Sequence, residues 1–160
     1  MRLLRTMRFE LVPMANVESA IPQLPRGASV SVTCSPAEGV AATIALTDRL
    51  ARLGHDVVPH VSARMVEGPG HVTEVANWIR TVGLHRIFVI AGDSPRPVGP
   101  YPDAVSLARA LVADECGLRH IGFAAYPDGQ LGISGLHCFT FNNLAETRAW
   151  SDSIIGDQPT

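Results

Sequence analysis

Short apolar runs alternate along the chain with longer segments whose apolar residues recur at helical spacing. The clearest run extends from Ile87 to Ile90 and leads through Ala91 into Gly92 and Asp93. A parallel strand that is buried on both faces has this β-branched and aromatic composition. Comparable runs cover 7–13, 28–33, 56–60, 121–127 and 133–141. The pattern therefore predicts six strands.

Helices are predicted between these strands. They are expected at about 36–53, 71–82 and 103–113, with a last one from Asn143 and one helical turn within 14–27. The second helix has apolar residues at positions i, i+3, i+4 and i+7, namely Val72, Val75, Ala76 and Ile79. Ser35 and Glu38 have the spacing of a capping box, with Pro36 at the first helical position. Gly54 and Gly83 are predicted to end the first two helices.

The alternation of strands and helices predicts an α/β fold with a parallel sheet and right-handed crossovers. No shift in composition marks a second domain, so we expect residues 1–160 to form one domain. The fifth and sixth strands are joined by 127–135, which is too short for a crossover helix.

Three arrangements of the sixth strand are open. It forms a hairpin around Asp128 and Gly129, it lies parallel to 9–12, or it exchanges with a second chain. We expect 136–141 to lie parallel to 9–12, because the helix that follows Asn142 then finds a surface for its apolar side chains.

Composition excludes several classes of function. The net charge of −2 gives no argument for a nucleic-acid or membrane-surface partner. All 13 basic residues are arginine, which excludes a lysine Schiff base and a Walker-type phosphate lysine. Three cysteines without CxxC spacing argue against a disulfide framework or a metal site, and favour the cytoplasm. No apolar run approaches the length of a membrane span.

Residues with chemistry recur at the ends of the predicted strands. They are Glu10, Thr33, His60, Asp93, Tyr126, and Thr140 or Asn142. Because ligands bind at the carboxyl ends of parallel strands, these residues are expected to share one rim of the sheet. Simpler explanations are also open: His60 as a core histidine, Thr33 as a helix cap and Asp93 as a turn residue. Glu10 is harder to explain in this way, because a charge within a strand is costly unless it is paired or solvated.

Six motifs, taken in order, resemble the methylenetetrahydrofolate reductase family. They are Phe9 to Pro13, Val32-Thr33, Val58 to Ala63, Gly92-Asp93, Ala124 to Asp128 and Leu136 to Asn142. The resemblance implies a TIM barrel with FAD at the carboxyl ends of the strands. It also implies hydride transfer from NADH or NADPH to 5,10-methylenetetrahydrofolate, a folate substrate, giving 5-methyltetrahydrofolate for methionine synthesis.

The resemblance also implies roles for individual residues. Glu10 corresponds to the acid that helps open the folate ring, and Asp93 to the carboxylate near the flavin. The positions that correspond to flavin contacts are Thr33, His60, Gly92 and Tyr126, and Tyr101 and Ala124 are further candidate cofactor positions.

The chain departs from the family pattern in two ways. Ala91 stands where the family usually has arginine, and two strand–helix units are missing between about 128 and 133. The expected fold is therefore a TIM-barrel-like parallel sheet reduced to about six units. FAD, if bound, is expected to be held weakly. Open sheet edges favour a homo-oligomer.

Two functions follow from these observations. The first is a methylenetetrahydrofolate reductase-like oxidoreductase, favoured by the presence of Glu10, His60 and Asp93. The alternative is a non-catalytic, internally deleted remnant that acts at most as a folate- or flavin-binding module, favoured by the missing units.

Overall fold

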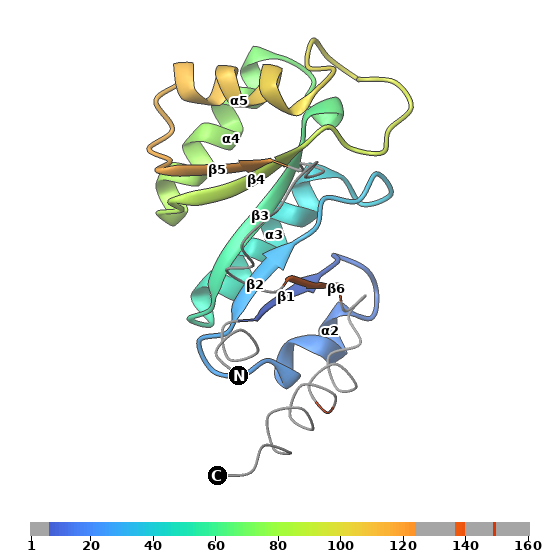
Figure 1. Ribbon diagram of the computed structural model, residues 1–160, viewed down its shortest axis with the longest axis vertical. Helices are drawn as coiled ribbons and strands as arrows, with labels where there is room; N and C mark the ends of the chain where they lie inside the picture. Colours follow the sequence, from blue (N-terminus) through green and yellow to red (C-terminus); the bar gives the residue numbers. More distant parts are fainter. Residues whose placement is uncertain (1–6, 124–136, 140–148, 150–160) are drawn as a thin grey trace, which may run out of the picture.

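The computed structural model describes residues 7–123, 137–139 and 149, and in this part the chain is an α/β protein built on one parallel sheet (Figure 1). The strands are β1 (Arg8–Leu11), β2 (Ser29–Val32), β3 (Asp56–Ser62), β4 (Arg86–Ile90), β5 (His120–Phe123) and β6 (His137–Phe139). The helices are α2 (Val17–Ala20), α3 (Gly39–Arg52), α4 (Pro69–Val82) and α5 (Ala104–Ala113), with 3-10 turns η1 (Ile21–Gln23) and η2 (Ala63–Met65). The predicted fold class, α/β with a parallel sheet, is thus confirmed.

The strands lie in the order β5-β4-β3-β2-β1-β6. Each of the first four strands pairs in parallel with the next one in sequence. In the described part of the chain they form an open row, with β5 at one edge and β6 at the other. Because all the pairs are parallel, the carboxyl ends of the strands lie at the same end of the sheet. The candidate residues were expected at this end.

The pairing of β6 confirms the arrangement that we expected for the last strand. β6 lies parallel to β1, with Arg8 opposite His137 and Glu10 opposite Phe139. The hairpin alternative would have placed it antiparallel to β5, but β5 pairs with β4 alone within the described residues. The connection from β5 to β6 is too short for the crossover helix that a parallel pair of these two strands would need. β6 instead pairs with β1, at the opposite edge of the sheet.

One face of the sheet carries the core. Alternate strand residues, such as Leu11, Val30 and Val89, are fully buried. They pack with helix residues in two apolar clusters, one around α2 and the second half of α3 with β1 and β2, the other around the start of α3, α4 and α5 with β4. Because side chains alternate across a strand, the remaining strand residues face away from these helices.

The start of α3 differs from the prediction. The helix begins at Gly39 rather than at Pro36, and no described side chain caps it. Ser35 instead holds a preceding turn, in which its hydroxyl accepts from the Ala37 N–H at 3.3 Å. Gly39 has a φ of 79°, so right-handed helical backbone does not run through it from Pro36. The predicted capping box with Glu38 is therefore wrong.

Other helix ends follow local sequence. Gly83 ends α4 in the left-handed conformation, with φ of 73°, as predicted. The capping box lies at α5, where the Asp103 carboxylate accepts from the Ser106 N–H at 2.8 Å. Predicted strands that extend into 124–136, and the helix from Asn143, lie outside the described residues.

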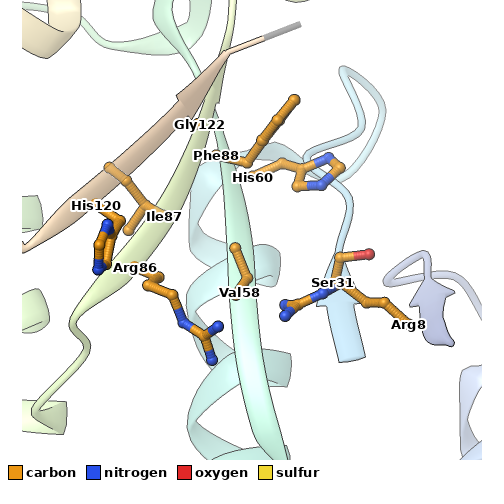
Figure 2. A pocket seen from close by; sticks show the side chains of 9 residues that line it. All are labelled: Arg8, Ser31, Val58, His60, Arg86, Ile87, Phe88, His120 and Gly122. Carbon is orange, nitrogen blue, oxygen red and sulfur yellow. The ribbon is translucent and has the colours of Figure 1, made fainter. Parts of the chain in front are cut away.

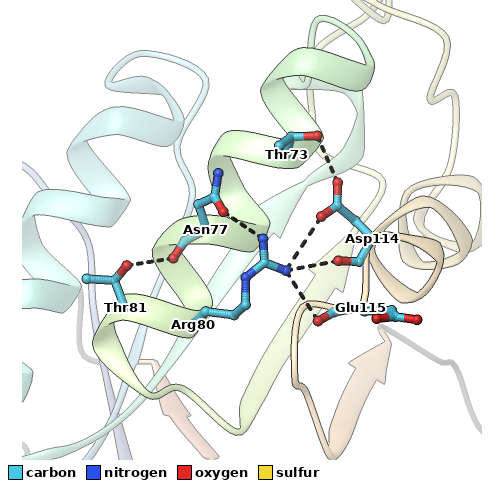
Figure 3. Close-up of polar contacts among 6 residues, drawn as sticks. All are labelled: Thr73, Asn77, Arg80, Thr81, Asp114 and Glu115. Carbon is cyan, nitrogen blue, oxygen red and sulfur yellow. Dashed lines mark hydrogen bonds and ion pairs between the residues drawn. The ribbon is translucent and has the colours of Figure 1, made fainter.

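Arg80 joins α4 to the end of α5 (Figure 3). Its guanidinium donates to the carbonyl oxygens of Asp114 and Glu115 at 2.9 and 3.2 Å, and it forms an ion pair with the Asp114 carboxylate at 3.5 Å. Thr73 donates to the same carboxylate at 2.8 Å. The network fixes Glu115 just beyond α5, where its φ of 50° lies in the left-handed region.

Replacing Glu115 by glycine is expected to raise the free energy of unfolding by about 0.5 to 1 kcal/mol, because glycine adopts this backbone without the penalty that a Cβ imposes. The Arg80 contact is to the Glu115 carbonyl oxygen and survives the change. Urea unfolding of the two proteins measures the difference. Glu115→Ala is the control, since it removes the carboxylate and keeps the Cβ; an equal gain in that variant would contradict the backbone explanation.

Candidate functional site

The face of the sheet opposite the helices carries polar and apolar side chains and is hollowed. A cavity of about 530 Å³ lies on this face (Figure 2). It is lined by residues of all five strands from β1 to β5: Arg8, Ser31, Val58, His60, Arg86, Ile87, Phe88, His120 and Gly122. Most of them alternate with the core residues, which assigns the cavity to the face of the sheet away from the described helices.

Glu10 lies on this face and is held at the carboxyl ends of β1 and β2. Only 4% of the surface of Glu10 is exposed. Glu10 is opposite Ser31 in the sheet, and the Thr33 hydroxyl donates to its carboxylate. Thr33 is itself positioned by its backbone, whose N–H donates to the Leu11 carbonyl at 2.9 Å. The structure therefore brings together two of the predicted residues, a buried carboxyl group and a hydroxyl that orients it.

His60 lies inside β3, because that strand continues to Ser62 and not just to His60 as predicted. Its ring is 5.0 Å from the ring of Phe88, measured between centroids, at an angle of 39°. Both side chains line the cavity and are drawn together in Figure 2. His60 thus occupies the same face of the sheet as Glu10, two strands away.

Gly92 has a structural reason to be glycine. Its φ is 91°, and a Cβ at this position would stand 1.8 Å from the Ser62 hydroxyl oxygen. Ser62 is fully buried, and its hydroxyl donates to the Ala91 carbonyl at 3.3 Å. Gly92 therefore permits the close approach of the end of β4 to the end of β3.

Asp93 is exposed in the loop that Gly92 opens. Arg64 fixes this loop: its N–H donates to the Ala91 carbonyl at 3.0 Å, and its guanidinium donates to Ser94 and Pro102 carbonyls at 3.1 and 3.0 Å. Asp93 lies beyond the carboxyl end of β4, on the predicted side of the sheet, but it is not among the residues that line the cavity of Figure 2.

The remaining candidate cofactor positions lie elsewhere. Tyr101 is 8% exposed and belongs to the apolar cluster of α4 and α5. Ala124 and Tyr126 lie outside the described residues. The assignment of these three positions to a cofactor stays a prediction.

Cys34 is a core residue. It is buried in the cluster of α4 and α5, and its thiol donates to the Met65 sulfur at 3.8 Å. Burial raises the pKa of the Cys34 thiol, although hydrogen bonds with Ser62 and Thr43 oppose this. A thiol in such surroundings is a poor nucleophile.

Sequence reasoning missed a charged cluster at the amino ends of the strands. Asp56 forms ion pairs with Arg86 at 2.5 Å and with Arg8 at 3.7 Å, and it accepts from the Ser29 hydroxyl at 3.2 Å. A signal in the sequence could have revealed this cluster: three of the strands begin with a charged residue, namely Arg8, Asp56 and Arg86.

The pKa of Asp56 is lowered in the folded protein. Partial burial alone would raise it, but the hydrogen bond and charge of Arg86, with smaller contributions from Ser29 and Arg8, outweigh that effect. The pKa of Arg8 is also lowered, by burial first, against the attraction of Asp56. The carboxylate form of Asp56 is therefore favoured by folding.

Replacing Asp56 by asparagine is expected to lower the free energy of unfolding at neutral pH by about 1 kcal/mol, since the side chain is half exposed and screening weakens its pairs. A depressed pKa contributes stability above the unfolded value of 3.8. That contribution is lost as the pH falls through the lower folded pKa. Urea unfolding from neutral to strongly acidic pH measures the gap between the two proteins. A gap that persists in strong acid would contradict the ion-pair explanation.

In 7–123 and the other described residues, no group of three His, Cys, Asp or Glu side chains is arranged to hold a metal ion. None of the described helices is long and apolar enough to cross a membrane. In a scan against models of protein families, no family model matches this chain.

Proposed function

We propose that this chain is a methylenetetrahydrofolate reductase-like oxidoreductase. It transfers hydride from NADH or NADPH, through a flavin where one is held, to 5,10-methylenetetrahydrofolate. In this proposal the parallel sheet is an arc of a TIM-like barrel reduced to about six units. The observation that carries the proposal is the buried Glu10 carboxyl group, which accepts from Thr33 at the carboxyl ends of adjacent parallel strands. That edge is where α/β proteins bind ligands.

Glu10 is proposed as the general acid. A proton from its carboxyl group passes to the folate nitrogen as the bond from that nitrogen to the methylene carbon breaks. The other nitrogen then carries an iminium, and hydride adds to the methylene carbon to give the methyl product. A positioned acid of this kind typically contributes about 10² to 10⁴ in rate. The hydrogen bond from Thr33 fixes the orientation of the carboxyl group.

The flavin would be held by few of the predicted residues. Thr33 and His60 lie toward the carboxyl ends of β2 and β3, on the side where the resemblance expects the flavin. Gly92 allows Ser62 to approach the backbone closely, and Tyr101 packs in the core, so each has a structural role that does not involve a flavin. Together with Ala91 in place of arginine, this supports weak flavin binding, in which the nicotinamide nucleotide remains the source of hydride.

A second candidate is a folate- or flavin-binding module without turnover. The observation that favours it is the exposed position of Asp93, away from the cavity that His60 lines. If the family's second carboxylate is needed beside the substrate, this chain would bind without reacting.

Three measurements on the purified chain separate these functions. A flavin absorbance spectrum reports the cofactor, calorimetry with tetrahydrofolate reports binding, and methylenetetrahydrofolate-dependent NAD(P)H oxidation reports turnover. Turnover supports the reductase. Folate or flavin binding without turnover supports the module. Neither binding nor turnover would contradict both proposals.

A further inference from the structure

Two arginines converge at the amino-end half of the cavity. Figure 2 shows the guanidinium groups of Arg8, from β1, and Arg86, from β4, on either side of Val58 of β3. Both are paired with the one carboxylate of Asp56. Two cations that share one anion leave a net positive charge at this end of the cavity.

One donor of this pair has no acceptor among the described residues. The Arg8 Nη1 atom is buried and has no hydrogen-bond acceptor within the part of the chain that the structure describes. A buried donor that is left unsatisfied costs roughly 1 to 3 kcal/mol. The Arg8 side chain is 22% exposed, so a rotation of its guanidinium would let the oxygen of a carboxylate or phosphate satisfy this donor. The planar guanidinium fork is well suited to such groups.

The adjoining wall of the cavity is apolar. It is formed by Val58, Ile87 and the ring of Phe88, with Gly122 of β5 beside that ring. A Cβ on Gly122 would stand 2.5 Å from the Phe88 ring, so the absence of a side chain there lets the ring lie against β5. The cavity, about 530 Å³, falls in the size range of small-molecule sites.

We infer that this cavity binds a small organic anion with a flat apolar body, such as an aryl carboxylate or aryl phosphate. The acidic group lies between Arg8 and Arg86, and the apolar body lies against Val58 and Phe88. The anion-binding residues begin their strands, whereas Glu10 and Thr33 lie at the carboxyl ends. The inference thus goes beyond the proposed reductase and does not depend on Glu10 or on hydride transfer.

Phenyl phosphate is the probe, and the measurements use a buffer without phosphate. Inorganic phosphate and phenol, which each represent one half of the probe, are measured for comparison. Isothermal calorimetry is expected to show phenyl phosphate binding at least tenfold more tightly than either half. Arg8→Gln is expected to weaken phenyl phosphate at least tenfold. Arg52→Gln, which removes an exposed arginine at the end of α3, is the matched control and should bind as the wild type does.

Phe88→Leu tests the apolar half while both arginines remain. It is expected to weaken phenyl phosphate at least threefold and to leave inorganic phosphate unchanged. Thermal unfolding identifies any variant that does not fold. If one of the two variants does not fold, the binding of phenyl phosphate by the other still tests the inference. Equal binding of phenyl phosphate and phosphate by the wild type, or unchanged binding by a folded Arg8→Gln or Phe88→Leu variant, would overturn the inference.

Discussion

Replacing Glu10 by glutamine is expected to lower methylenetetrahydrofolate-dependent NAD(P)H oxidation by about 10² to 10⁴, the usual contribution of a general acid. Glutamine has nearly the same shape, and its carbonyl oxygen still accepts from the Thr33 hydroxyl. The exchange therefore removes the transferable proton while leaving the packing of a buried side chain largely intact. The measurement is kcat at saturating folate for the wild type and the variant.

Glu74→Gln is the control for this experiment, because Glu74 is an exposed glutamate on α4, on the side of the sheet away from Glu10. It should leave kcat unchanged. Urea unfolding of Glu10→Gln separates lost chemistry from lost structure. A folded Glu10→Gln protein with the wild-type rate would remove Glu10 from the mechanism, and with it the observation on which the proposed function rests.

Replacing Gly92 by alanine is expected to lower the free energy of unfolding by about 2 to 4 kcal/mol, the sum of left-handed backbone strain and overpacking. The new Cβ would stand 1.8 Å from the Ser62 hydroxyl oxygen and 3.0 Å from the Ser62 Cβ. Ser62 is fully buried in β3 and has little room to move. Urea unfolding measures the loss.

Gly27→Ala is a matched control for the backbone term alone. Gly27 also has a positive φ, 65°, but nothing stands within 4 Å of its would-be Cβ. It should cost about 1 kcal/mol, from strain without overpacking. Adding Ser62→Ala to Gly92→Ala removes the nearest atom and should restore part of the stability. Equal losses at Gly92 and Gly27 would show that the contact with Ser62 does not matter.

The Gly92 experiment also bears on the site. The family resemblance implies a flavin contact for the glycine before Asp93, which stays a prediction, whereas the structure gives this glycine a packing partner in Ser62. A stability loss of the expected size, measured without any cofactor, would show that packing alone requires glycine here.

Local sequence determined most of the secondary structure of this protein. The β-branched runs became β2, β3 and β4, and the helical spacing of Val72 and Ile79 became α4, because periodicity and backbone preference act between near neighbours. The position of β6 beside β1 was one of three arrangements that the short connection left open. It was expected because the helix after Asn142 would find a surface there for its apolar side chains. Glu10 was singled out for the same local reason, as a charge within an apolar strand.

Tertiary structure decided which side chains meet. The hydrogen bond from Thr33 to Glu10 joins residues 23 positions apart, and the ion pair of Asp56 with Arg86 spans 30. Neither is encoded in a local pattern, because strand register sets both. The need for glycine at position 92 depends on Ser62, a residue of another strand. The sequence by itself thus determined most of the strands and helices and the end of the sheet at which Glu10 and Thr33 lie. Packing of distant strands determined the contacts, because parallel pairing brings together residues that the chain keeps far apart.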